Sequence, residues 1–347
     1  MSLGDTQHGN ARPGIQVRDL TLRFGQQVIF DGLNFDIAGG SFVALLGASG
    51  AGKTSLLKII AGLAKPTSGT VIGSDGLPIA GRIAYMGQKD LLYPWLTIDE
   101  NISLGARLRG EKVDRAWAEH LRERVGLNGY GRSLPAALSG GMRQRAAIAR
   151  TLYERQPIVL MDEPFSALDT GLRAATRKAV AELLAEAKVA SILVTHDQTE
   201  ALSFADQVAV MRNGRLAQVG PPQDLYLRPV DEPTATFLGE TLVLSADLEQ
   251  GWAQCALGRI AVDDGSRRGP ARIMLRPEQV QISQSESQHS SQAVVTHIDF
   301  AGFVSTLNLR MANNDATIEL KTVSREGLRA GTLVNLNIIG QAHIFAG

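Results

Sequence analysis

The fold of this chain is decided by one stretch, Leu45-Leu46-Gly47-Ala48-Ser49-Gly50-Ala51-Gly52-Lys53-Thr54-Ser55. It fits the phosphate-loop pattern G-x-x-x-x-G-K-[ST] without a mismatch. The apolar run from Phe42 to Leu46 predicts a buried strand before the loop, and the spacing of the apolar side chains from Leu56 to Ile60 predicts a helix after it. This order of strand, glycine loop and helix is the one that the motif needs, so a glycine-rich turn that matches by chance is a poor explanation.

Each residue type in the loop has a physical reason. Gly50 and Gly52 let the backbone curl so that N–H groups point at phosphate oxygens, and the N-terminus of the following helix adds partial positive charge. We expect Lys53 to reach the β- and γ-phosphates and the Thr54 hydroxyl to ligate Mg²⁺. We assign the other members of the loop to the same nucleotide site: Gly47, Ser49, Ala51 and Ser55.

Length and composition limit the possible functions. A chain of 347 residues suits two domains, and 44% apolar residues allow a substantial core. Charge is balanced, with 35 basic and 35 acidic residues, which argues against a broad basic face for nucleic acid. Cys255 is the single cysteine, so a disulfide framework and a thiolate metal cluster are excluded and a reducing cytosol is expected. No apolar run approaches the ~18 residues that span a bilayer, so any link to a membrane requires a partner.

The first two thirds of the chain predict an α/β domain. After a flexible lead over residues 1–14, partly alternating segments between residues 15 and 37 predict an antiparallel sheet. Residues 66–76 are rich in turn formers, and residues 98–136 have a helical pattern, which predicts a helical insertion over about 89–150. Apolar segments then alternate with a helix over 170–187 whose apolar face includes Leu172, which predicts a largely parallel sheet. Its strands are expected at 83–86, 158–161, 191–195 and 208–211.

The last third has a different character. Prolines and loop residues from Pro221 to Pro233 predict a link, and residues 241–347 predict an all-β module, a small barrel-like domain. The Ser/Gln-rich stretch from Ser283 to Gln292 is expected to be a solvated loop within it. The segments expected to be strands are 271–275, 293–298, 304–309, 316–320 and 333–338.

A second motif with candidate catalytic residues lies at residues 158–169, which read I-V-L-M-D-E-P-F-S-A-L-D. The apolar strand delivers Asp162 to the carboxyl end of the sheet, where α/β folds bind ligands and a carboxylate can hold Mg²⁺. Glu163 follows directly and can orient a water molecule and accept its proton. An isolated Asp-Glu pair is more often a solvated turn, but the strand before it and the phosphate loop upstream favour catalysis.

Over roughly residues 15–235, the chain resembles the ATP-binding-cassette (ABC) ATPases, with several further motifs in the family's order. The resemblance implies that Gln88 senses Mg²⁺ and the attacking water, and that Leu138-Ser139-Gly140-Gly141-Met142-Arg143-Gln144 is the family signature. It implies that Phe24 stacks on adenine, that Ser166-Ala167-Leu168-Asp169 belongs to the nucleotide site and that His196 contacts the γ-phosphate. The alternatives are an ordinary core residue for Phe24 and a structural, hydrogen-bonded histidine for His196. Ser139 is also a good helix N-cap, so a plain capped helix is the alternative for the signature.

The resemblance also implies partners and a location. With one phosphate loop and one signature per chain, a complete site needs a second ATPase subunit, so a homodimer that holds two ATP molecules and Mg²⁺ is expected. The tail, including Met274 to Gln279, resembles the regulatory domain of bacterial importer ATPases and looks most like that of ferric-iron importers. Importers of polyamines, phosphonates, thiosulfate-type anions or pyrimidine precursors stay open, as does a soluble regulatory or DNA-associated ATPase.

We therefore expect a peripheral protein on the cytoplasmic face of the inner membrane that energises integral membrane permease subunits. A periplasmic or lipid-anchored substrate-binding protein would be an indirect partner, and nucleic acid would not be one. The stretch Leu91-Leu92-Tyr93-Pro94-Trp95-Leu96 is unusually apolar. It is either core of the helical insertion or a partly exposed groove that grips a helix of a membrane subunit, and we favour the groove.

Overall fold

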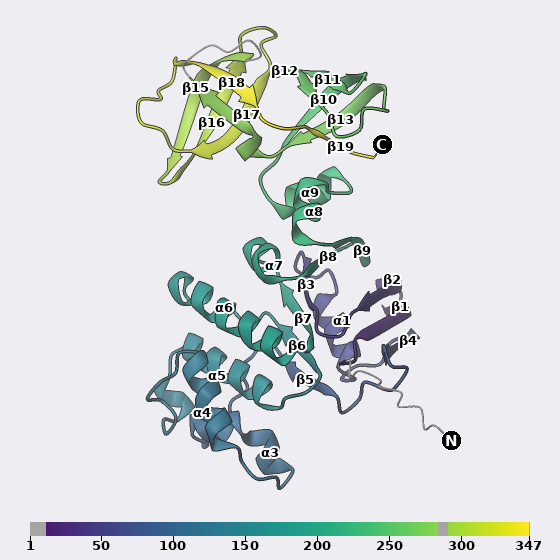
Figure 1. Cartoon of the computed structure of the whole chain (residues 1–347), viewed down its shortest axis with the longest axis vertical. Coiled ribbons are helices and arrows are strands. Elements are labelled where there is room, and N and C mark those ends of the chain that lie inside the picture. Colours follow the sequence, from purple (N-terminus) through teal and green to yellow (C-terminus); the bar gives the residue numbers. More distant parts are fainter. Residues whose placement is uncertain (1–11, 284–290, 347) are drawn as a thin grey trace, which may run out of the picture. The chain divides into compact units, whose positions relative to one another are not determined.

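The structure is a computed structural model that describes residues 12–283 and 291–346. The chain divides into two compact units at the Pro222–Gln223 bond (Figure 1). The predicted lead up to residue 11 and residues 284–290 of the predicted Ser/Gln-rich loop lie outside the described residues. Within the described residues, no helix combines the length and the apolarity that crossing a bilayer requires.

The first unit is built on a six-stranded sheet in the order β5-β6-β7-β3-β8-β9, parallel except for β9, which runs antiparallel to β8. This confirms the predicted α/β class. Its strands are β3 (Phe42–Gly47), β5 (Ile83–Met86), β6 (Ile158–Asp162), β7 (Ala190–Thr195), β8 (Gln207–Arg212) and β9 (Arg215–Gly220). The helices that connect them outside the insertion are α1 (Lys53–Ile60), α6 (Thr170–Ala187) and α7 (Gln198–Phe204).

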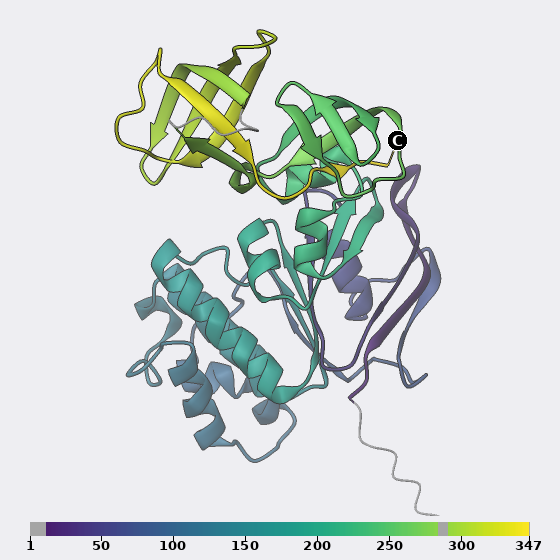
Figure 2. The same cartoon turned by 45° about the horizontal axis from the view of Figure 1, so that its top comes forward.

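Side chains from the two faces of this sheet pack into two separate apolar cores. Ile158 and Leu160 of β6 pack into one core with α1, while Val159 and Met161 point into the other. Alternating side chains of a strand point to opposite faces, so a continuous apolar run is what a sheet covered on both sides requires. Figures 1 and 2 show α1 on one side of the sheet and α6 on the other.

An antiparallel sheet covers α1, as predicted, in the order β2-β1-β4, with β1 (Ile15–Phe24), β2 (Gln27–Ile37) and β4 (Ser68–Gly73). Strand β4 lies in the stretch that the sequence predicts to be turns, so that expectation is wrong for these residues. Gly69 has a φ of +91°, and a Cβ there would lie 2.5 Å from the Asp19 carbonyl. The glycine that resembles a turn signal is the residue that lets β4 approach β1.

The predicted helical insertion is present and packs against the sheet through the core that contains Leu121 and Ile148. Its helices are α2 (Ile98–Ile102), α3 (Leu104–Leu108), α4 (Arg115–Arg124) and α5 (Gly140–Tyr153), with a 3₁₀ turn at Pro135–Ala137. Helix α6 has the predicted bounds, and Val180 and Leu184 are buried. Leu172 is 43% exposed instead of buried, because it lies in the first turn of α6, beyond the buried stretch of the helix.

The second unit is all-β beyond residue 241, as predicted, and consists of two five-stranded antiparallel sheets. The first sheet has the order β12-β11-β10-β13-β19 and the second the order β14-β18-β15-β16-β17, and both contribute to one apolar core. The strands are β10 (Leu242–Glu249), β11 (Trp252–Cys255), β12 (Gly258–Ala261), β13 (Gly269–Leu275), β14 (Val280–Ser283), β15 (Ser291–Ala301), β16 (Val304–Met311), β17 (Thr317–Val323), β18 (Leu333–Ile338) and β19 (His343–Ile344), with a 3₁₀ turn at Pro277–Gln279.

The predicted link is instead two short helices, α8 (Pro222–Leu227) and α9 (Glu232–Leu238). Each helix has a proline in its first turn, where the backbone N–H that proline lacks would have no partner within the helix. The helices are tied to the β-sheets by Arg276, which is completely buried and donates to the carbonyls of Tyr226 and Ala235. The domain boundary that we predict near residues 235–241 lies after these helices and stays a prediction.

Candidate active site

The phosphate loop joins β3 to α1 in the predicted order of strand, loop and helix. Gly47 cannot carry a side chain, because a Cβ there would lie 2.5 Å from the Met211 carbonyl oxygen, and Gly52 has a φ of +96°. Gly52 is also the N-cap of α1 and has no side chain to cap it, so N–H groups of the first turn can serve a phosphate.

Lys53 is folded back against its own loop. Its Nζ donates to the carbonyl oxygens of Gly47 at 2.6 Å and Ala48 at 3.0 Å, and the residue is only 6% exposed. Burial lowers the pKa of the ammonium group, against the opposing pull of the Glu163 and Asp162 carboxylates. The two carbonyl contacts therefore hold the Lys53 Nζ against the phosphate loop, where it could also donate hydrogen bonds to an anion.

The three residues predicted to hold magnesium lie together. The Thr54 hydroxyl donates to Asp162 Oδ1 at 3.2 Å and accepts from Gln88 Nε2 at 3.4 Å. Asp162 is 1% exposed and its Oδ2 is buried without a hydrogen-bond partner. Burial raises the pKa of this carboxyl group, and the Thr54 hydrogen bond opposes the shift. An orphaned buried carboxylate oxygen beside a hydroxyl group, with the Gln88 side-chain amide next to that hydroxyl, suits a hard divalent cation.

Glu163 and His196 face each other at the carboxyl ends of β6 and β7. His196 Nδ1 lies 3.2 Å from Glu163 Oε1, and the histidine side chain is 61% exposed. Glu163 has a φ of +50°, a left-handed conformation that is strained for a non-glycine residue. Its N–H donates to the Val194 carbonyl at 2.9 Å, which helps to hold the residue in this conformation.

Gln144, which the sequence identifies only as the last residue of the signature, is a positioning residue in the structure. It is 3% exposed, its Nε2 donates to the Glu163 carbonyl at 3.0 Å, and its Oε1 accepts from the Ala167 N–H at 2.7 Å. Ser166 Oγ donates to the same Glu163 carbonyl. Gln144 thereby ties α5 to the backbone around Glu163. A polar residue among the apolar residues on the buried face of a helix indicates a buried hydrogen bond, and this pattern could have pointed to the role of Gln144.

The predicted site residues Phe24, Ser139, Gly140, Gly141 and Asp169 make no hydrogen bond or ion pair with the side chains of Lys53, Thr54 or Glu163 in the part of the chain that the structure describes. Ser139 caps α5 by accepting from the Met142 N–H, and Gly140 and Gly141 form the start of that helix. Asp169 caps α6 through the Leu172 N–H. Phe24, at the end of β1, is 63% exposed, so it is not an ordinary core residue. Within the described residues, no hydrogen bond or ion pair joins the signature to the phosphate loop.

The apolar stretch after Gln88 forms an exposed surface. Leu91, Tyr93 and Trp95 are 66%, 41% and 70% exposed, whereas Leu92 is buried in the core of the insertion. Arg150 of α5 holds the backbone beneath them by donating to the carbonyls of residues 90 and 91 at 2.7 and 2.8 Å. The stretch is therefore mostly a rigidly held apolar surface rather than core.

Comparison with known families supports the two-unit description. Residues 30–166 match the ABC transporter family, and residues 273–345 match the TOBE domain family.

Full-length relatives are also similar. The chain is 60% identical over 329 residues to the Fe(3+) ions import ATP-binding protein FbpC of Serratia marcescens, covering 92% of this chain and 95% of the relative. It is 53% identical over 336 residues to the protein of the same name from Yersinia pseudotuberculosis, with the same coverage of both chains.

Solved structures of ABC cassettes resemble part of the chain. A dimeric ATP-binding cassette in a post-hydrolysis state, bound to ADP and Pi, is 28% identical with a TM-score of 0.54, covering 60% of this chain and 98% of that one. A dimeric bacterial ABC transporter cassette is 29% identical with the same TM-score and coverage. With these motifs, this geometry and these relatives, the chain belongs to the family of ABC transporter ATP-binding proteins, and it carries a C-terminal TOBE domain.

Proposed function

We propose that this chain hydrolyses ATP to energise the import of ferric iron through separate membrane subunits. The observation that carries the proposal is the convergence of Lys53, Thr54, Asp162 and Glu163 at one edge of the sheet. These residues combine a phosphate cradle, a divalent-cation site and a carboxylate base, which together suit hydrolysis of a nucleoside triphosphate. The full-length similarity to ferric-iron import proteins supports the cargo.

In this site, Lys53 and the N-terminus of α1 bind the phosphates, and the exposed Phe24 ring offers a stacking surface for the base. Thr54, Asp162 and Gln88 would hold Mg²⁺. When bound, the ion neutralises charge on the phosphate oxygens.

Glu163 is the general base. Its carboxylate orients the attacking water and takes its proton, while Gln144 and the Val194 carbonyl hold its strained backbone in place. His196, 3.2 Å from Glu163, is placed to contact the γ-phosphate and to orient the same carboxylate.

The signature acts across a dimer. Since Ser139, Gly140 and Gly141 start a helix away from the phosphate loop of their own chain, we propose that they bind the ATP held by a second copy, together with Asp169. The dimeric state of the two similar solved cassettes supports this arrangement. Loss of the bridging γ-phosphate would loosen the dimer and so transmit hydrolysis to the membrane subunits.

The exposed surface of Leu91, Tyr93 and Trp95 is the proposed docking site for a helix of the permease. It begins three residues after Gln88, so movement at the magnesium site reaches it through a short, anchored segment. The protein would then work at the cytoplasmic face of the inner membrane, and a substrate-binding protein would deliver the cargo from the other side.

The test of the mechanism is Glu163→Gln, which keeps the shape of the side chain and removes the base. We expect hydrolysis to fall roughly 10²–10⁴-fold while ATP still binds, so that an ATP-dependent dimer accumulates. Adding Ser139→Arg should disperse that dimer. Size-exclusion chromatography with light scattering measures both, and Glu123→Gln on the exposed part of α4 is the matched control. A Glu163→Gln protein that stays monomeric at saturating MgATP contradicts the composite site.

The cargo is tested separately, by uptake of radiolabelled ferric iron in cells that lack the gene and are complemented with wild-type protein or Glu163→Gln. We expect uptake with the wild type only. Uptake of a polyamine, a phosphonate, a thiosulfate-type anion or a pyrimidine precursor instead would keep the ATPase assignment and overturn the iron assignment.

A further inference from the structure

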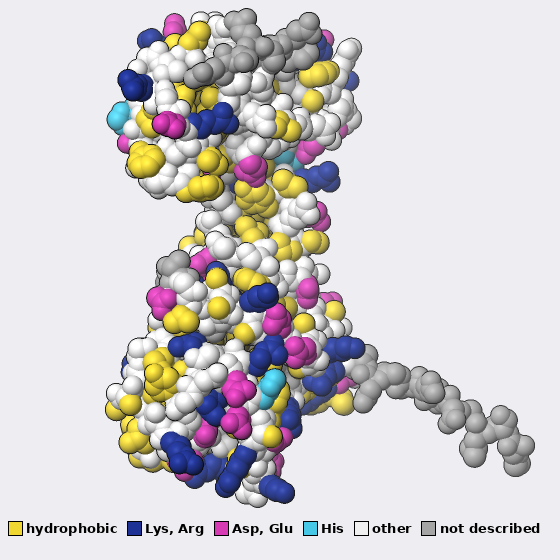
Figure 3. All heavy atoms as spheres, turned by 60° about the vertical axis from the view of Figure 1, so that its left-hand side comes forward, with side chains coloured by type: hydrophobic (Ala, Val, Ile, Leu, Met, Phe, Trp, Pro, Cys, Tyr) yellow, Lys and Arg dark blue, Asp and Glu magenta, His cyan; other side chains and the backbone are white. Residues whose placement is uncertain are grey.

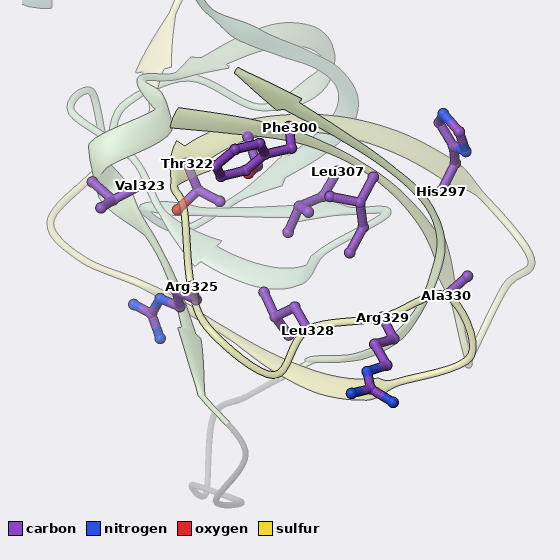
Figure 4. Close-up of a pocket in the computed structure, with 11 residues that line it drawn as sticks. His297, Phe300, Leu307, Thr322, Val323, Arg325, Leu328, Arg329 and Ala330 are labelled. Carbon is purple, nitrogen blue, oxygen red and sulfur yellow. The ribbon is translucent and has the colours of Figure 1, made fainter. Parts of the chain in front are cut away.

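The second unit contains a cavity of about 390 Å³ beside the end of β15, the start of β16 and the end of β17 (Figure 4). Apolar side chains line it, among them Phe300, Leu307 and Leu328. The charged ends of Arg325 and Arg329 point away from it. Small-molecule sites combine an apolar lining with convergent polar groups, so this cavity indicates no class of ligand. On the face of the first unit that Figure 3 shows, side chains of both charges are mixed, which indicates no charged partner.

The first unit contains a buried carboxylate that the proposed mechanism does not use. Glu200 of α7 is 4% exposed. Burial raises the pKa of its carboxyl group, and the hydrogen bond from Thr195 opposes the shift. The ion pair with Arg177 is long, with 3.9 Å between Nη1 and Oε1. Because burying a carboxylate without a close charged partner is costly, the place of Glu200 in the fold requires another explanation.

The short contact of Glu200 is with the end of the strand that precedes His196. Thr195, the last residue of β7, donates from Oγ1 to Glu200 Oε2 at 2.5 Å. The same hydroxyl oxygen accepts from the Asp197 N–H at 2.9 Å, and Asp197 Oδ1 accepts from the Glu200 N–H at 3.1 Å. A hydroxyl has one hydrogen to donate, so the Glu200 acceptor directs it and leaves the oxygen lone pairs for the Asp197 N–H. These hydrogen bonds enclose the backbone of His196, which lies between Thr195 and Asp197.

Helix α6 holds the same turn from another side. Arg173 Nη1 lies 3.6 Å from Asp197 Oδ2, and Arg173 Nη2 donates to the Leu168 carbonyl at 2.8 Å. The His196 side chain, in contrast, is 61% exposed, and its Nδ1 lies 3.2 Å from Glu163 Oε1. An exposed imidazole has little packing of its own, so its direction depends on the backbone of the turn that carries it.

We infer that Glu200 is a positioning residue for His196. Its carboxylate directs the Thr195 hydroxyl, the hydroxyl fixes the Asp197 N–H, and the turn so formed aims the imidazole at Glu163. This inference rests on the proposed role of His196 in ATP hydrolysis. The competing explanation is that Glu200 only stabilises the junction between β7 and α7.

The test compares steady-state ATP hydrolysis by full-length variants. His196→Ala should lower kcat roughly 10²–10³-fold, as loss of one transition-state contact does. Glu200→Ala should lower kcat roughly tenfold, because a misplaced group loses part of its effect, and should leave the KM for ATP unchanged. Glu200→Gln should recover most of the lost kcat, since its amide oxygen can accept from Thr195. Thr199→Ala, exposed on α7, is the matched control and should hydrolyse ATP like the wild type.

A double variant separates positioning from general destabilisation. If Glu200 acts through His196, Glu200→Ala should lower kcat no further in a protein that already carries His196→Ala. A merely structural defect would instead lower kcat by the same factor in both backgrounds. The second readout is the NMR signal of the His196 imidazole in histidine-labelled protein, assigned by its absence from His196→Ala. It should shift in Glu200→Ala and return in Glu200→Gln.

Failure of the inference and failure of the proposed function give different results. A wild-type kcat for Glu200→Ala, or equal losses in both backgrounds, overturns the inference and leaves the proposed function standing. A wild-type kcat for His196→Ala refutes the catalytic role of His196, and an imidazole signal that does not shift in Glu200→Ala then overturns the positioning role as well. If Glu200→Ala does not fold, Thr195→Val removes the hydroxyl at the other end of the contact and is expected to give the same results.

Discussion

Replacing Arg276 by methionine should destabilise the second unit far more than any surface change. The guanidinium is completely buried and lies 4.1 Å from the centre of the Tyr226 ring. It donates to the carbonyls of Tyr226, Ala235, Gly239 and Glu240 at 2.7–3.1 Å. One side chain therefore satisfies the C-terminal carbonyls of α8 and α9 and joins both helices to the β-sheets.

The magnitude follows from these contacts. Methionine fills much of the volume but leaves the carbonyls without a donor, and each unsatisfied buried group costs about 1–3 kcal/mol. Water that enters the site can donate to some of these carbonyls and so reduces the cost. We therefore expect the free energy of unfolding to fall by about 3–5 kcal/mol, as when one partner of a buried ion pair is removed. For a unit of this size, each kcal/mol lowers the Tm by roughly 3–5 °C, which gives a decrease of about 10–25 °C.

Differential scanning calorimetry of the full chain measures this decrease. The transition of the first unit is identified by its shift when MgATP is added, and it should not move in Arg276→Met without nucleotide. Arg272→Met is the control, because Arg272 lies on β13, four residues before Arg276, is half exposed and pairs with Glu232 on the surface. Such a pair is worth about 0–1 kcal/mol. If Arg276→Met lowers the Tm no more than Arg272→Met, the reasoning from buried hydrogen bonds is wrong.

Three further predictions concern the first unit and its ends. Lys53→Ala should weaken ATP binding roughly 10–100-fold by calorimetry, whereas Lys58→Ala, exposed on the same helix, should not, and equal effects would refute the phosphate-loop role. Trp95→Asp should keep ATP hydrolysis and lose iron uptake, because the ring is 70% exposed, and loss of both would indicate a folding role. A chain that ends at Pro222 should stay monodisperse and bind ATP, whereas one that ends near residue 240 should aggregate, because it carries α8 and α9 without Arg276. Equal solubility of the two truncated chains by light scattering would place the boundary near 235–241, as the sequence predicts.

The nucleotide site was largely predictable because its residues lie in short contiguous motifs. The glycines of residues 47–52, the carboxylates at 162–163 and His196 each end a strand of one parallel sheet. Carboxyl ends of parallel strands meet at one edge, so the order of elements alone places these side chains together. The contacts of Gln144 were not predictable, because its partners, Glu163 and Ala167, are brought to it only by the packing of α5 against the sheet.

The two wrong predictions of secondary structure, turns at residues 66–76 and a link at residues 221–233, have a common physical origin. Gly69 in β4 and the prolines of α8 and α9 are local turn signals, and each was overruled by contacts with residues distant in sequence. The pairing of β-strands and the burial of one arginine are worth more than the intrinsic preference of a glycine or a proline. A local pattern carries no information about such partners.

The sequence by itself therefore determined the α/β class, the phosphate loop, the position of the Asp162 and Glu163 carboxylates at the end of a strand, and the all-β character of the second unit, because each depends on local pattern and period. Only the tertiary structure decided that Leu91, Tyr93 and Trp95 are exposed while Leu92 is buried. It alone decided that Gln144 holds the backbone at Glu163, and that Phe300 lines an open cavity. Exposure and hydrogen bonding depend on which distant surfaces meet, and that is set by the packing of whole elements rather than by any short stretch of chain.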